Sequence, residues 1–95
     1  MADKQAYIDN VAAKVHAFEA QLDKMLAKAR EAEGEQRKNY EEASAEIRRK
    51  IDDLNNRLEQ MRESSGDAWE KFRAGVEDAT SEIKQALAGD PKGTA

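Results

Sequence analysis

The sequence has no cysteine, one proline and only five aromatic residues of the Phe, Trp and Tyr types in 95 positions. The absence of cysteine excludes disulfides, thiolate nucleophiles and cysteine-ligated zinc. Large aliphatic residues are also scarce, because leucine, isoleucine, valine and phenylalanine together number 14 while alanine alone numbers 17. So few large apolar side chains cannot fill the core of an ordinary all-β domain. Apolar runs never exceed three residues, so no membrane-spanning segment is expected.

Charged and helix-forming residues take the place of the missing apolar ones. Charged residues make up 38% of the chain, with 16 basic and 20 acidic side chains and a net charge of −4. Abundant Ala, Glu, Lys, Arg and Gln with nearly balanced charge is typical of long helices and coiled coils. No stretch is basic enough to neutralise a row of phosphates, so we expect no nucleic-acid partner. Without cysteine or a signal-like N-terminal run, the expected compartment is the cytoplasm.

Apolar residues recur at steps of three and four, which is the spacing of one face of a helix. In the later runs the local period lengthens from seven toward eleven residues. We interpret these positions as an interaction stripe. It consists of Ile8, Val11, Val15, Phe18, Leu22, Met25, Tyr40, Ile47, Ile51, Leu54, Leu58, Met61, Trp69, Phe72, Val76, Ile83 and Leu87.

The chain is expected to form a single all-α coiled-coil domain over residues 1–95. A helix is predicted from about residue 3 to residue 63, a break at 64–66, and a second helix over 67–88. Gly66 can adopt the left-handed conformation that ends helices, and Asp67 with Glu70 has the spacing of a capping box. After Gly89-Asp90-Pro91 we expect a frayed tail, residues 89–95.

The region around Gly34 allows two architectures. Between Leu26 and Tyr40 there is no large apolar residue, so the chain could turn there and form an antiparallel three-helix bundle. Such a turn usually contains Asn, Asp, Ser or Pro, none of which stands next to Gly34, and one glycine costs a helix only about 1 kcal/mol. Glu33 and Arg37 also have the favourable i,i+4 order across Gly34. We therefore favour the uninterrupted long helix.

No set of residues has the spacing of a catalytic or metal centre. His16 is the only histidine, and Ala13 stands where a Glu-x-x-His di-iron motif needs its carboxylate. The pairs Glu41-Glu42 and Asp52-Asp53 are adjacent on a helix, so their side chains point about 100° apart. We expect no cofactor, metal, small-molecule substrate or enzymatic activity.

Trp69 and Phe72 form the most distinctive local feature. They lie one turn apart on the last predicted helix, and Val76 continues the same side. We interpret them as packing residues that hold the short helix against the long one or against another subunit. The alternative is an exposed aromatic anchor for a partner or a membrane.

Several short segments carry a resemblance to a known family. They are Gln21-Leu22-Asp23, Lys28-Ala29-Arg30-Glu31-Ala32-Glu33, Tyr40, Ala68-Trp69 and Gly75-Val76-Glu77. Over roughly residues 7–88 the chain resembles a family of small, uncharacterised bacterial coiled-coil proteins labelled as stress-response proteins. Members often have a second tryptophan near the position of Thr80, and this chain departs from that pattern. The resemblance implies no catalytic residues.

Taken together, these features predict a homo-oligomeric coiled coil that acts as a non-enzymatic structural or interaction protein, with the stress association implied by the resemblance. One chain with an amphipathic face gains most of its stability by burying that face against a partner. The alternative is a peripheral protein whose amphipathic helices bind a lipid surface. The slight negative charge weakens attraction to anionic lipid, so this remains the second hypothesis.

Overall fold

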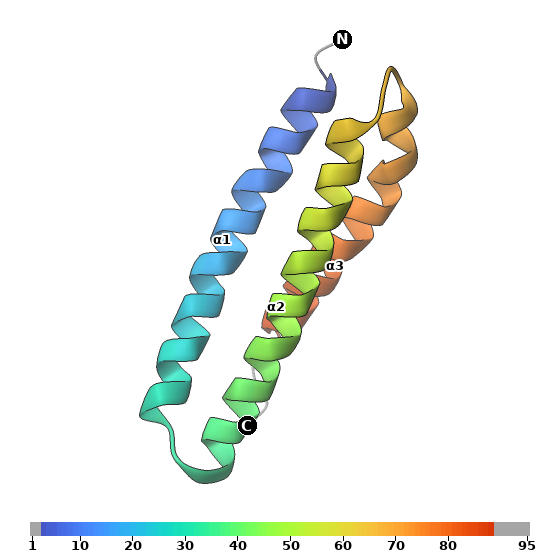
Figure 1. The fold of residues 1–95 in the computed structure, drawn as a ribbon. Helices are drawn as coiled ribbons and strands as arrows, with labels where there is room; N and C mark the ends of the chain where they lie inside the picture. Colours follow the sequence, from blue (N-terminus) through green and yellow to red (C-terminus); the bar gives the residue numbers. More distant parts are fainter. Residues whose placement is uncertain (1–2, 89–95) are drawn as a thin grey trace.

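A computed structural model describes residues 3–88. Three α-helices and one short 3₁₀ helix follow one another: α1 (Asp3–Glu31), α2 (Gly34–Glu63), η1 (Ala68–Phe72) and α3 (Arg73–Ala88). The predicted all-α class is confirmed. The helices α1 and α2 form a long antiparallel hairpin, and α3 turns back along α2 (Figure 1). The bundle measures 52 Å along its axis and 17 Å across.

The prediction of an uninterrupted helix over residues 3–63 is wrong, and the alternative turn near Gly34 is what the structure contains. Only Ala32 and Glu33 separate α1 from α2. Glu33 is extended (φ −134°, ψ 158°) and Gly34 is left-handed (φ +62°), a conformation that glycine adopts without a Cβ clash. Turning back buries the apolar face of α1 against the same chain. That gain outweighs the small local preferences that favoured a straight helix.

At the second turn, between α2 and η1, the predicted helix end is confirmed and the predicted capping box is wrong. α2 ends at Glu63 as predicted, and Gly66 is left-handed (φ +56°). The capping box does not form, because the Asp67 side chain makes no cap hydrogen bond. Its backbone (φ −91°, ψ 2°) lies outside the extended region from which N-cap side chains reach the following amides. The chain therefore restarts as the 3₁₀ helix η1 before α3, while the predicted helix end at Gly89-Asp90-Pro91 and the frayed tail lie outside the described residues.

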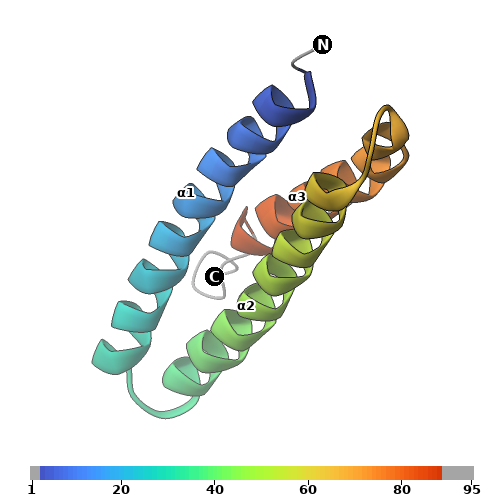
Figure 2. The same ribbon diagram turned by 45° about the horizontal axis from the view of Figure 1, so that its top comes forward.

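The helix α2 is the common packing partner of the bundle. It packs against α1 along the hairpin and against η1 and α3 on the return, whereas the backbones of α1 and α3 come close to each other at few points. Both views place α3 behind the hairpin of α1 and α2 (Figures 1 and 2). The position of α1 in the bundle therefore depends mainly on α2.

Candidate functional site

The predicted interaction stripe lies inside the bundle. Phe72 and Leu87 are half-buried, and the other stripe residues are buried. The buried members are Ile8, Val11, Val15, Phe18, Leu22, Met25, Tyr40, Ile47, Ile51, Leu54, Leu58, Met61, Trp69, Val76 and Ile83. In this bundle the stripe is therefore the core of one chain, contributed by α1, α2, η1 and α3.

Two buried polar residues belong to this core and were not predicted from the apolar pattern. They are Ser44 on α2 and Thr80 on α3. Each hydroxyl donates to the carbonyl four residues earlier, Ser44 to Tyr40 at 2.7 Å and Thr80 to Val76 at 2.8 Å. A search for apolar residues alone overlooks them, but Ser44 follows Tyr40 by four and precedes Ile47 by three, which is the spacing of the stripe.

An aromatic cluster joins the start of α1 to η1 and α3. It consists of Tyr7, Trp69, Arg73 and Glu77. The rings of Tyr7 and Trp69 are tilted by 43° with centroids 5.7 Å apart. The Arg73 guanidinium lies 5.3 Å from the Tyr7 ring centroid and 5.9 Å from that of Trp69, within cation–π range. Trp69 is therefore a packing residue, as predicted, and its partners come from both ends of the sequence.

The fold shifts the pKa of the Tyr7 phenol. Its hydroxyl donates to Oε2 of Glu77 at 3.4 Å, and Arg73 Nε lies 3.6 Å from the same oxygen. Burial is the main reason that the pKa of Tyr7 is raised above 10.0, followed by the negative charge and the hydrogen bond of Glu77. Arg73 opposes that rise. The arrangement stabilises the neutral phenol and thereby the contact between α1 and α3.

A lysine at the start of α1 caps the end of α2. Lys4 Nζ donates to the carbonyl oxygens of Arg62 at 3.0 Å and Ser64 at 2.8 Å. The last carbonyls of a helix have no intrahelical partner and carry partial negative charge, so a cation there is favourable. Together with the aromatic cluster, this contact holds the free end of the α1–α2 hairpin closed.

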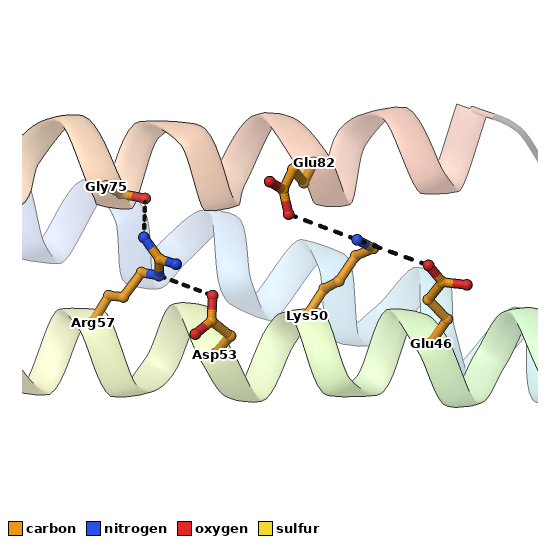
Figure 3. Close-up of polar contacts among 6 residues, drawn as sticks. All are labelled: Glu46, Lys50, Asp53, Arg57, Gly75 and Glu82. Atoms are coloured by element: carbon orange, nitrogen blue, oxygen red, sulfur yellow. Dashed lines mark hydrogen bonds and ion pairs between the residues drawn. The ribbon is translucent and has the colours of Figure 1, made fainter.

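Charged side chains also connect α2 to α3 (Figure 3). Lys50 Nζ lies 3.8 Å from Glu46 on its own helix and 3.6 Å from Glu82 on α3. Arg57 pairs through Nε with Asp53 at 2.8 Å and donates from Nη1 to the Gly75 carbonyl at 3.1 Å. Both Lys50 and Arg57 thus pair at i,i+4 on α2, and each of these side chains also reaches the neighbouring helix.

The pair predicted across Gly34 is not present. Because the chain turns there, Glu33 and Arg37 are no longer on one continuous helix, and Arg37 Nε lies 3.3 Å from Glu41 instead. The side chain of Arg37 therefore pairs within α2.

The remaining chemistry-bearing residues lie on the surface. The His16 side chain is 83% exposed and 3.7 Å from Glu19, and residues 3–88 contain no group of three His, Cys, Asp or Glu side chains placed to hold a metal ion. The paired carboxylates Glu41-Glu42 and Asp52-Asp53 are exposed. Hollows in the surface, such as one of about 290 Å³ between α1 and α3, are lined mainly by polar side chains including Asn10, Lys14 and Lys84.

None of the helices in residues 3–88 combines the length and apolar character needed to cross a membrane. Comparison with protein-family models, with curated proteins and with solved structures found no match to this chain.

Proposed function

We propose that this chain is a non-enzymatic structural or interaction protein that self-associates through its apolar stripe. The observation that carries the proposal is the attachment of α1. This helix contributes a continuous row of buried residues, from Ile8 to Ala29, and its backbone lies close to α2 along the hairpin but close to α3 at few points. A helix held mainly by one neighbour can be replaced by an equivalent helix from another molecule, which makes the stripe available to a partner.

The distribution of charge supports the non-enzymatic part of the proposal. Enzyme sites usually place titratable groups in partly dry pockets, where burial shifts their pKa values toward the working pH. Among the buried residues of the described chain only Tyr40 has a titratable side chain. The charged side chains lie on the outside of the bundle, where they form helix-surface pairs such as Arg62 with Glu59 at 2.7 Å.

The proposal includes a cytoplasmic setting and an association with stress. A chain without cysteine suits a reducing compartment, where disulfides are not needed or kept. The stress association comes from the family resemblance of segments such as Lys28 to Glu33 and Ala68-Trp69.

The direct test is the absolute mass in solution. Light scattering after size exclusion, at two protein concentrations, should yield a dimer or larger species whose share increases with concentration. A 10.6 kDa monomer at both concentrations would contradict self-association. Replacing Leu54 and Leu58 by aspartate is a poor test, because both side chains are buried and the bundle would unfold instead of dissociating.

A specific feature of α1 favours lipid-surface binding as a second candidate. Three exposed lysines, Lys14, Lys24 and Lys28, lie on the helix whose other face carries the stripe. Lysines flanking an apolar face are typical of helices that lie in a headgroup layer. The test is quenching of Trp69 by vesicles of anionic phospholipid with brominated acyl chains. Quenching would support insertion, and unchanged emission would remove this candidate. Because Trp69 is only 6% exposed in the bundle, a blue shift alone would not be informative.

A further inference from the structure

The turn between α1 and α2 has very little holding it. Ala32 donates its backbone N–H to the carbonyls of Lys28 at 3.0 Å and Ala29 at 3.3 Å, which only finish α1. Glu33 provides no side-chain cap for α2. Within residues 3–88, and apart from its chain neighbours and the backbone of its own helix, no atom lies within 4 Å of the position that a Cβ on Gly34 would occupy. The hinge, residues 32–34, is therefore maintained by the backbone conformation of Gly34 and by the packing of the helices it joins.

The apolar residues on the two sides of the hinge are in phase for a single helix. Ala29 is the last buried residue of α1 and Tyr40 is the first of α2, eleven residues later. Eleven residues make three helical turns at 3.67 residues per turn, so both would face the same side of a straight helix. Straightening the hinge would merge the stripes of α1 and α2 into one face about 90 Å long, against the 52 Å of the bundle.

We infer that two copies of this chain exchange α1. In the exchanged dimer the hinge is helical, α1 and α2 form one continuous helix in each chain, and α1 of each copy packs against α2 and α3 of the other. The inference rests on the proposed self-association and specifies how the stripe reaches its partner. The partner is a second copy of this chain because only an identical α1 reproduces every contact that the first α1 leaves.

The contacts at the free end of α1 are specific enough to set the register of the exchanged helix. Lys4 would donate to the α2 carbonyls of Arg62 and Ser64 of the other copy, and Tyr7 would pack against Trp69 of the other copy. Both contacts exist within one chain in the closed bundle. The closed bundle and the exchanged dimer have the same core and the same contacts at the free end of α1. They therefore differ mainly in the conformation of the hinge and in the entropy of association.

Gly34 therefore controls the balance between the two forms. Alanine disfavours the left-handed conformation that the closed hinge needs, and it favours the helix that the open hinge needs. We expect Gly34→Ala to raise the association constant of the dimer about a thousand-fold, since both hinges of a dimer change. The matched control is Gly34→Asn. Asparagine adds a side chain at the same position but tolerates the left-handed region, so it should leave the protein close to the native balance.

Cross-linking separates an exchanged dimer from any other dimer. His16 on α1 and Glu59 on α2 line the same surface hollow and are both exposed. Because the chain has no cysteine, His16→Cys with Glu59→Cys creates a unique pair for a flexible bismaleimide. In the closed bundle the cross-link forms within one chain. In the exchanged dimer the two sites of one chain are about 65 Å apart on one helix, so the cross-link joins two chains.

The experiment measures mass by light scattering and cross-linked species on a denaturing gel, for the native sequence, Gly34→Ala and Gly34→Asn in the cysteine-pair background. A dimer that increases strongly in Gly34→Ala and gives covalently linked dimers supports the exchange. Circular dichroism confirms that the alanine variant remains helical. A Gly34→Ala protein that stays monomeric with cross-links within one chain overturns the exchange. A native dimer that cross-links only within each chain also overturns it, while the proposed self-association would stand.

Discussion

The guanidinium of Arg57 occupies the space in which a side chain at residue 75 would begin. A Cβ added to Gly75 would lie 2.9 Å from Arg57 Nη1, and the same Nη1 donates to the Gly75 carbonyl at 3.1 Å. A glycine inside a helix costs about 1 kcal/mol relative to alanine. At Gly75 the gain that alanine would bring is opposed by the need to move the Arg57 guanidinium.

This relationship predicts an interaction between two substitutions. Gly75→Ala should change the free energy of unfolding little, because the gain in helix propensity is offset by displacing the Arg57 guanidinium. In an Arg57→Ala background the same change should stabilise the protein by about 1 kcal/mol. Urea denaturation of the four proteins of this cycle measures the coupling. Equal effects of Gly75→Ala in both backgrounds would show that the contact does not matter.

Lys4 is expected to contribute to stability through the end of α2. Lys4→Met keeps most of the side-chain stem but removes the charge and both hydrogen bonds, so the free energy of unfolding should decrease by about 1 kcal/mol. Lys14→Met is the control, since Lys14 is an exposed lysine on the same helix and its loss should change stability by less than about 0.5 kcal/mol. Chemical denaturation followed by circular dichroism distinguishes the two. Similar values for both variants would mean that the cap is not stabilising.

The raised pKa of Tyr7 predicts a loss of stability in alkali. The phenol of the unfolded chain loses its proton near pH 10, whereas the folded protein retains it to higher pH. In that interval the unfolded state binds fewer protons, so the free energy of unfolding falls as pH rises through the folded-state pKa. Below pH 10 this contribution is fully present.

Two variants isolate this effect. Tyr7→Phe should show a smaller decrease in stability between about pH 9 and pH 11 than the native protein, because the titrating group is gone. Glu77→Gln should also reduce it, since the Glu77 carboxylate is the second cause of the shift. Denaturation at several pH values measures all three proteins. Parallel pH profiles for the native protein and Tyr7→Phe would exclude a contribution from Tyr7.

The burial of the stripe predicts a graded response to truncation. Leu54 is completely enclosed between helices, so Leu54→Ala should destabilise the bundle by about 2 to 5 kcal/mol. Leu87 is half-buried near the end of α3, and the same truncation there should cost clearly less. Thermal unfolding of both variants compares the two positions. A small effect at Leu54 would contradict its place at the centre of the core.

Much of the secondary structure could be read from local patterns. The spacing from Ile8 to Met25 and from Ile47 to Met61 indicated helices whose buried faces are those observed, and Gly66 marked the second turn correctly. These features depend on residues close together in the chain, so periodicity and backbone preference are sufficient to recognise them. The clustering of Tyr7 with Trp69 and Glu77 had no such signal, because it joins positions some 60 to 70 residues apart.

The amino-acid sequence by itself determined that the chain is helical, which face of each helix is apolar and where the second break occurs. Tertiary structure alone decided that the chain turns at Gly34 and that α2 is the shared partner of α1 and α3. The local preferences at the hinge differ by only about 1 kcal/mol, since one glycine and one surface ion pair are all that distinguish a turn from a helix there. The burial of the α1 face against α2 is worth several times more, and it depends on pairing residues of two different helices along the whole hairpin.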